Sequence, residues 1–165
     1  MIFMNNKARK NVHIVCGSDS DLSQVLATLA SFSIKASIKI HVISCHRNPR
    51  DLVDFIFNRV QDGDIVIGVG SKALALPGVI DAWAYHFKKN VRVAGVALGE
   101  SGSNALLAAQ LSIEELPGQP VIINEITGKA YTGPEGLRKL IKLIDNGELP
   151  PSKPRKDKPT QIDIC

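Results

Sequence analysis

At 165 residues, the chain has the length of one ordinary domain and can bury a hydrophobic core without disulfides or metal. Its 44% hydrophobic and 22% charged residues are the balance of a soluble globular protein, and no apolar stretch approaches the roughly 18 residues of a membrane span. The net charge of +4 gathers largely in the two ends, and only 5% of the residues are aromatic, so we expect no nucleic-acid partner and no membrane.

The chain ends and the cysteines bear on the compartment. Residues 1–11 carry positive charge, but no apolar segment follows them, which does not fit a secretory signal. The three cysteines are an odd number without metal-ligand spacing: Cys16, Cys45 and Cys165. Reduced thiols suit a cytosolic chain, so we expect a cytoplasmic protein that holds no metal.

The first part of the chain predicts two strand–helix units. Residues 12–16 form an apolar run rich in β-branched residues, and apolar residues then recur at helical spacing over 22–29. The polar segment between them supplies four residue types that cap helices, so the helix should begin there: Ser18, Asp19, Ser20 and Asp21. A second strand is predicted over 37–43 and a second helix over 52–60.

The same alternation continues to the end of the domain. Further strands are predicted at 65–69, 91–98 and 120–123, and further helices at 79–87, 104–111 and 136–144. Strands that are apolar on both faces and alternate with helices are typical of a parallel sheet covered on both sides. We therefore predict an α/β fold, a three-layer α/β/α sandwich of flavodoxin-like type with a parallel central sheet.

This domain should span residues 12–146, between an N-terminal extension at 1–11 and a C-terminal tail at 147–165. The tail is rich in proline and lysine and offers almost nothing to bury, so we expect it to be disordered or loosely packed.

Two polar loops carry the residues that could do chemistry. In open parallel sheets, ligands bind beyond the carboxyl ends of the strands, and both loops fall at that edge. The backbone amides and hydroxyls of 17–21 could hold a phosphate, although two aspartates would repel it unless they face sugar hydroxyls. A well-capped helix explains this loop equally well.

The second loop, 44–49, places a histidine beside an arginine. A single histidine at a strand end is more often a structural residue, but Arg47 offers a forked cation suited to phosphate and His46 can exchange protons near neutral pH. Strand alternation would send the Cys45 side chain to the opposite face from His46, which argues against a Cys–His nucleophile pair. The other three histidines are not assigned to the site: His13, His41 and His86.

The sequence GSDSDL, followed one strand–helix unit later by SCHRNP, closely resembles the signature of the PurE family, in which GSxSD and SAHRTP play these parts. Further segments match in order: GVGSKAL resembles the family's third glycine-rich loop, GVA its GVP strand end, LPGQPV its MPxGxPV segment and ITGKA its IGKAG segment. The resemblance covers roughly residues 12 to 144.

The resemblance implies a flavodoxin-like subunit of a homo-octamer, acting on aminoimidazole ribonucleotide or its carboxylated forms and on carbon dioxide, without metal or other cofactor. His46 would be the catalytic acid–base and Arg47 would bind the phosphate. The implied substrate-binding residues are Gly17, Ser18, Asp19, Asp21, Ser44, Arg47, Gly70, Ser71, Lys72, Ala73 and Leu74.

Three positions depart from the family pattern. The mutase-type third loop reads GGAAHLPG, whereas this chain reads GSKALALPG, with Ala75 in place of the histidine and Lys72 introduced. The direct carboxylase type has a loop like GRSNALSG, which is nearer to this one, but Arg47 follows the mutase type. Glu100 is introduced in the loop after the GVA strand end. Lys72 could pair with Glu100, with a substrate carboxylate or with carbon dioxide, or it could be a solvated lysine.

The leading hypothesis is an enzyme of purine biosynthesis that forms 4-carboxy-5-aminoimidazole ribonucleotide by rearranging the N5-carboxylated form. Direct carboxylation with carbon dioxide is the first alternative. A carboxylase or decarboxylase of the same family that acts on another heteroaromatic substrate is the second, and a non-catalytic nucleotide-binding module is the third. A flavin site is disfavoured because the loops hold few aromatic residues.

Overall fold

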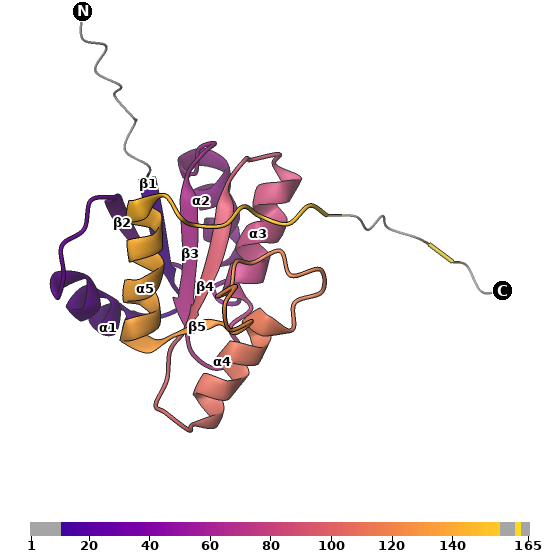
Figure 1. Cartoon of the computed structure of the whole chain (residues 1–165). Coiled ribbons are helices and arrows are strands. Elements are labelled where there is room, and N and C mark those ends of the chain that lie inside the picture. The colour runs from indigo at the N-terminus through magenta and orange to yellow at the C-terminus, as the bar shows by residue number, and fades with distance from the viewer. Residues whose placement is uncertain (1–10, 156–160, 163–165) are drawn as a thin grey trace, which may run out of the picture.

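A five-stranded parallel sheet forms the centre of the protein (Figure 1). The computed structural model describes residues 11–155 and 161–162; the predicted extension, apart from Asn11, and the last part of the predicted tail lie outside them. The strand order is β2-β1-β3-β4-β5, and the strands are β1 (Asn11–Cys16), β2 (Ser37–Val42), β3 (Ile65–Gly70), β4 (Arg92–Ala97) and β5 (Tyr131–Thr132). This is the flavodoxin-like order, so the predicted fold class is confirmed.

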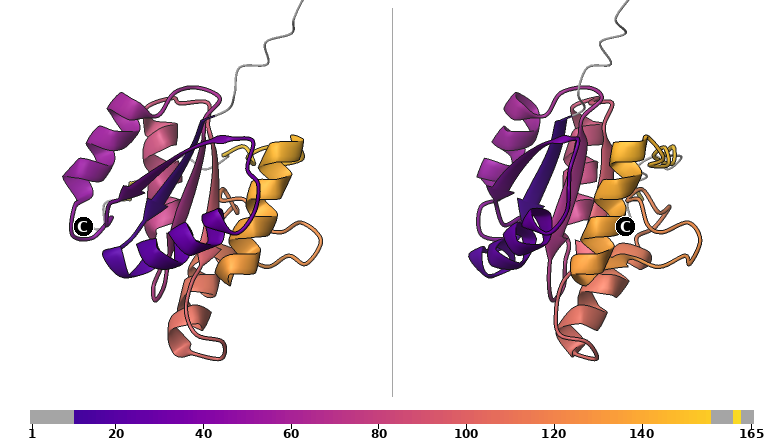
Figure 2. Two further views of the ribbon diagram at one scale, coloured as in Figure 1. Left: turned by 90° about the vertical axis from the view of Figure 1, so that its left-hand side faces the viewer. Right: turned by 60° about the vertical axis from the view of Figure 1, so that its left-hand side comes forward.

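Helices cover both faces of the sheet (Figure 2). They are α1 (Asp19–Ala30), α2 (Pro49–Arg59), α3 (Leu76–His86), α4 (Asn104–Glu114) and α5 (Gly133–Asn146). Side chains of α1 and α5 pack in one core with one face of the strands, whereas α2, α3 and α4 pack in a second core against the other face. The strands β1, β3 and β4 are buried almost throughout because helices cover both sides of the sheet, whereas the edge strand β2 is only partly buried.

The local sequence explains where the helices begin. Ser18 is the N-cap of α1, and Pro49 occupies the first turn of α2, where a missing N–H costs nothing. Ser103 caps α4 by accepting a hydrogen bond from Leu106 N at 3.1 Å. Of the helices described, none combines the length and the apolar character of a membrane span.

The predicted fifth strand at 120–123 is wrong. Its Ile122 forms only an isolated bridge with Ala94, and β5 is instead the two-residue strand Tyr131–Thr132. Val121 and Ile122 are buried, so the apolar pattern predicted burial correctly.

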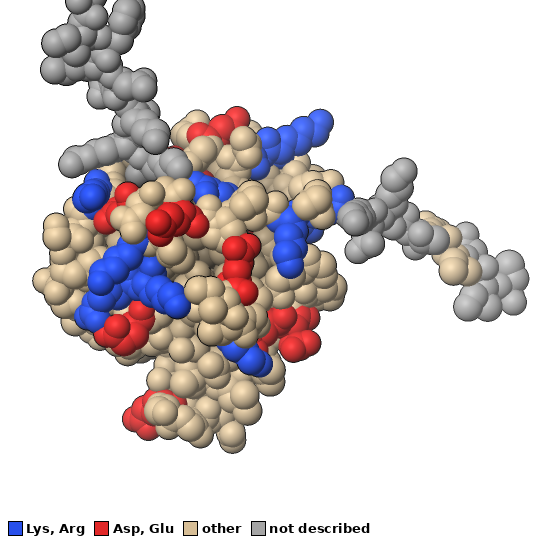
Figure 3. All heavy atoms as spheres, viewed as in Figure 1, with Lys and Arg blue, Asp and Glu red and all other residues tan. Residues whose placement is uncertain are grey.

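Residues 147–155 are anchored to the domain at particular points, although most of them are exposed, whereas the sequence predicted a disordered or loosely packed tail. Leu149 is buried at 5% exposure, and its carbonyl accepts a hydrogen bond from Arg92 Nη1 at 2.7 Å. Arg155 forms an ion pair with Asp81 on α3. We call residues 147–155 the strap, which crosses the sheet near the amino end of β4 (Figure 1). On this face, the largest group of Lys and Arg side chains lies over α5, and acidic side chains lie beside it (Figure 3).

Candidate functional site

The two polar loops and the loop after β3 enclose one cavity of about 460 Å³ at the carboxyl ends of β1, β2 and β3. All the predicted site residues except Asp19 line it; the full lining is Gly17, Ser18, Ser20, Asp21, Ser44, Cys45, His46, Arg47, Gly70, Ser71, Lys72, Ala73, Leu74, Ala75 and Leu76. Asp19 is exposed in the first turn of α1 and is not among the lining residues. The parallel topology brings loops that are far apart in sequence to the same edge.

Asp21 fixes the first loop. Its Oδ2 accepts hydrogen bonds from Ser18 N at 3.1 Å and from Ser18 Oγ at 2.9 Å. The Ser18 Oγ also lies 2.6 Å from Ser20 Oγ. Asp21 is only 6% exposed and forms part of the cavity wall. One of its carboxylate oxygens holds the loop through the two hydrogen bonds from Ser18.

Ser44 shapes the second loop and presents the histidine. Its Oγ accepts hydrogen bonds from His46 N at 3.3 Å and from Arg47 N at 3.1 Å, which closes a turn before α2. His46 is exposed, and its ring has no hydrogen-bond partner among residues 11–155 and 161–162. The imidazole is therefore available to a ligand in the cavity.

Arg47 joins the first two loops. Its Nη2 donates a hydrogen bond to the Gly17 carbonyl at 2.9 Å. A guanidinium has five N–H donors, so this contact orients the side chain and leaves donors free for an anion. The first loop and the second loop thus form one structural unit around the cavity.

The third loop supplies the apolar wall. Leu74 is 5% exposed and Leu76 is 2% exposed. A Cβ at Gly70 would lie 2.9 Å from Leu74 Cδ1 and 3.4 Å from Asp21 Oδ2, so a larger residue here would press on the Leu74 side chain of the apolar wall. The cavity therefore combines charged and hydroxyl groups on one side with an apolar surface on the other.

Sequence reasoning missed four lining residues: Ser20, Cys45, Ala75 and Leu76. The argument from strand alternation about Cys45 was wrong, because β2 ends at Val42 and Cys45 lies in the turn beyond it. Burial raises the pKa of the Cys45 thiol, so the thiol stays protonated at neutral pH and is a poor nucleophile.

Glu100 does not belong to this cavity. It is exposed, and within the described part of the chain it forms no ion pair with Lys72. Nor do any three His, Cys, Asp or Glu side chains of residues 11–155 and 161–162 lie close enough together to hold a metal ion.

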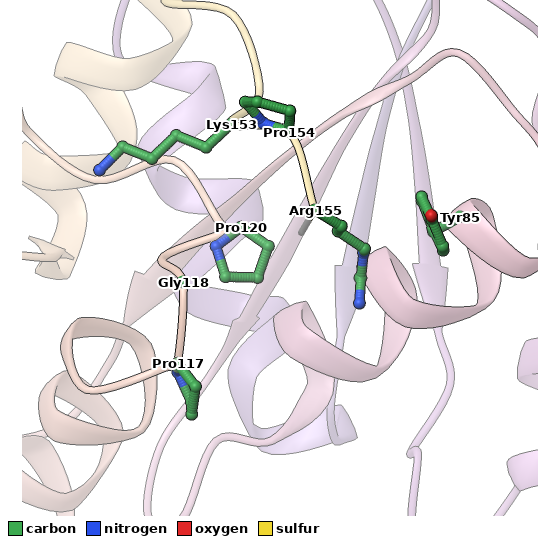
Figure 4. A pocket seen from close by; sticks show the side chains of 7 residues that line it. All are labelled: Tyr85, Pro117, Gly118, Pro120, Lys153, Pro154 and Arg155. Carbon is green, nitrogen blue, oxygen red and sulfur yellow. The ribbon is translucent and has the colours of Figure 1, made fainter. Parts of the chain in front are cut away.

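A second cavity, of about 500 Å³, lies beneath the strap (Figure 4). Its lining is Tyr85, Pro117, Gly118, Pro120, Lys153, Pro154 and Arg155, which includes no histidine, carboxylate or thiol. The guanidinium of Arg155 lies 4.6 Å from the centre of the Tyr85 ring and also pairs with Asp81. The groups capable of acid–base chemistry therefore line the first cavity.

Comparisons with known proteins agree with the resemblance noted in the sequence. Residues 11–87 match the family model for AIR carboxylase. The N5-carboxyaminoimidazole ribonucleotide mutase of Mycobacterium leprae is 32% identical over 134 residues, which are 78% of this chain and 74% of that protein. A crystal structure of Treponema denticola PurE aligns with a TM-score of 0.44 and 21% identity, over 61% of this chain and 63% of that chain.

Proposed function

This chain belongs to the PurE family of AIR carboxylases, and from that premise we propose that it acts in purine biosynthesis by rearranging N5-carboxyaminoimidazole ribonucleotide to 4-carboxy-5-aminoimidazole ribonucleotide. One observation carries the proposal: the GSDSD and SCHRNP loops meet in a single cavity, joined by the hydrogen bond from Arg47 to Gly17. An acid–base group and a forked cation then face the same ligand.

Arg47 is the proposed phosphate ligand, because a guanidinium matches phosphate with two parallel hydrogen bonds. Ser18 and Asp21 are proposed to bind the ribose, since Asp21 retains a second carboxylate oxygen beyond the one that holds the loop. The remaining proposed substrate contacts are Gly17, Asp19, Ser44, Gly70, Ser71, Lys72, Ala73 and Leu74, of which Asp19 has the weakest support because it lies outside the cavity lining.

His46 is the proposed catalytic residue. In the rearrangement, the bond between the exocyclic nitrogen and the carboxyl carbon breaks, and the nitrogen gains a proton. The released carbon dioxide then bonds to the ring carbon, which loses its own proton. One proton is gained and one is lost, so a single imidazole that donates and accepts in turn balances the reaction.

The apolar wall has a role in this chemistry. Carbon dioxide carries no net charge and must stay beside the ring between the two steps. Leu74 and Leu76 are buried residues that present apolar surface to the cavity, which supports retention of carbon dioxide and exclusion of water.

Direct carboxylation of aminoimidazole ribonucleotide by dissolved carbon dioxide is the second candidate, and a different heteroaromatic substrate is the third. The third-loop sequence is compatible with both alternatives, because Ala75 stands where the mutase type has histidine and because Lys72 lines the cavity. A silent nucleotide-binding module has less support, since His46 is accessible.

We propose a homo-octamer in the cytoplasm, as in the family that the sequence resembles. The exposed apolar residues of α4 support association with further copies: Leu107 is 53% exposed and Leu111 is 43% exposed, one helical turn apart. Analytical ultracentrifugation tests the octamer, and a monomer at assay concentrations would contradict it.

The function is tested by an ultraviolet assay with purified protein. Aminoimidazole ribonucleotide is supplied with bicarbonate alone, and the N5-carboxylated substrate is then generated in place, with His46→Asn as the control. Turnover of the N5-carboxylated form that is lost in His46→Asn supports the mutase, whereas turnover that needs only dissolved carbon dioxide supports direct carboxylation. No turnover in either case would overturn the assignment to this pathway.

A further inference from the structure

Three residues other than glycine have a positive φ within residues 11–155: Lys72 at 63°, Lys88 at 55° and Gln119 at 46°. This left-handed conformation is unfavourable for a residue with a Cβ, so each instance needs a local cause. Lys88 follows the C-cap of α3, and its N–H donates to Tyr85 O at 3.0 Å, a position where helices commonly adopt this conformation.

Gln119 is explained by its side chain. The Nε2 donates hydrogen bonds to Ile113 O at 3.0 Å and to Val121 O at 3.1 Å, and these contacts hold the turn. Two hydrogen bonds therefore accompany and offset this unfavourable backbone.

Lys72 has no comparable side-chain contact. Its N–H donates to Ala105 O at 3.0 Å, a bond that any residue, including glycine, would make. Within the described residues, its ammonium has no hydrogen bond or ion pair, and the residue lines the candidate active site. The mutase-type loop GGAAHLPG has glycine at this position, where a positive φ carries no steric cost. Strained backbone that nothing in the fold requires points to a role in binding.

We propose that Lys72 is the specificity-determining residue that recognises the carboxylate of a carboxylated ribonucleotide. The inference rests on the proposed function and names the second anion-binding group of the same site. A substrate of this class carries a phosphate and a carboxylate, and Arg47 and Lys72 are the cations among the residues that line the cavity in the described part of the chain.

The chemistry of the two cations assigns them to different anions. The Arg47 guanidinium is oriented by its bond to Gly17 O and offers a planar fork suited to phosphate. The Lys72 ammonium is a compact charge on a flexible stem, suited to a carboxylate whose position changes between the ring nitrogen and the ring carbon. It extends from the same loop as the apolar wall, beside which the carboxyl group would leave and return.

Lys88 offers a matched control, because it is also an exposed lysine with positive φ but lies outside the cavity lining. Isothermal titration calorimetry compares 4-carboxy-5-aminoimidazole ribonucleotide with uncarboxylated aminoimidazole ribonucleotide, for the wild type, Lys72→Gly, Lys72→Gln and Lys88→Gly. We expect both Lys72 variants to bind the carboxylated ligand roughly tenfold more weakly, because one charge-assisted contact is lost at a partly solvated site. Binding of the uncarboxylated ligand should stay within about twofold, by the same argument.

The melting temperatures of the glycine variants test whether the positive φ of each lysine destabilises the fold. Lys72→Gly and Lys88→Gly should each melt at or above the wild-type temperature, by up to about 4 °C for a domain of this size. A Lys72→Gly variant that melts lower would refute the statement that the fold does not need this lysine.

The remaining outcomes separate the inference from the proposed function. If the wild type binds both ligands and the Lys72 variants weaken both equally or neither, the carboxylate assignment is overturned and the proposed function stands. If the wild type binds neither ligand, the proposed function fails and the inference fails with it. A tenfold loss in Lys88→Gly as well would assign the effect to net charge and would also overturn the proposal.

Discussion

Acid should weaken this protein through two histidines in contact with each other, His13 on β1 and His41 on β2. His13 is 1% exposed; its Nε2 lies 3.1 Å from Asp64 Oδ2 and its Nδ1 lies 3.1 Å from His41 Nε2. Burial lowers the pKa of His13, although Asp64 opposes this. Burial is also the main reason that the pKa of His41 falls from 6.5 to about 4, with further contributions from His13, Arg59 and Lys39.

The direction in which the free energy of unfolding changes with pH follows from proton uptake by the unfolded chain. Between pH 6.5 and about pH 4, the unfolded chain binds a proton at residue 41 that the folded chain does not, so stability falls as the pH falls through this window. One pKa unit is worth about 1.4 kcal/mol, and His41 is only partly buried, so solvent screening reduces the effect. We expect the free energy of unfolding to fall by about 1 kcal/mol between pH 7.5 and pH 5.

Urea unfolding at pH 7.5, 6 and 5 measures this loss, with the midpoint expected to fall by about 0.5 M. His41→Gln keeps a donor for His13 Nδ1 but cannot titrate, so it should lose clearly less stability over the same range. His13 shifts in the same direction and accounts for the remainder. Equal losses in the wild type and His41→Gln, or a stability that does not change with pH, would refute this account.

Three further predictions concern catalysis, packing and the strap. His46→Asn should lower kcat by about 10²- to 10⁴-fold with little change in KM, as measured in the ultraviolet assay, and a kcat within tenfold of wild type would exclude His46 as the acid–base. In Gly68→Ala, the new Cβ would lie 2.9 Å from Pro77 Cγ, so thermal unfolding should report a loss of about 1–3 kcal/mol, and an unchanged melting temperature would contradict this packing. Leu149→Ala should cost about 2–3 kcal/mol in urea unfolding because Leu149 is 5% exposed, and a loss no larger than that of Arg155→Ala would mean that the strap is not anchored in the core.

The residues of the candidate site could be found from sequence because they follow strands directly. The loops at 17–21, 44–49 and 70–74 come at the carboxyl ends of parallel strands, which meet at one edge of a sheet whatever the details of packing. Their roles in substrate binding stay predictions. Asp19 shows the limit of this reasoning: it lies beside Ser18 in sequence, but it is the first residue of α1 and does not line the cavity.

By itself, the sequence determined the order of strands and helices and the starts of α1 and α4, because these depend on residues near one another in the chain. The helices α2, α3 and α5 begin three residues earlier than predicted. An N-cap such as Ser18 and a first-turn proline such as Pro49 each favour the start of a helix through backbone groups within a single turn. Only the tertiary structure decided the place of β5 and the anchoring of Leu149. Each depends on a partner far away in sequence, and a short local pattern carries no information about which distant groups will be near enough to pair with it.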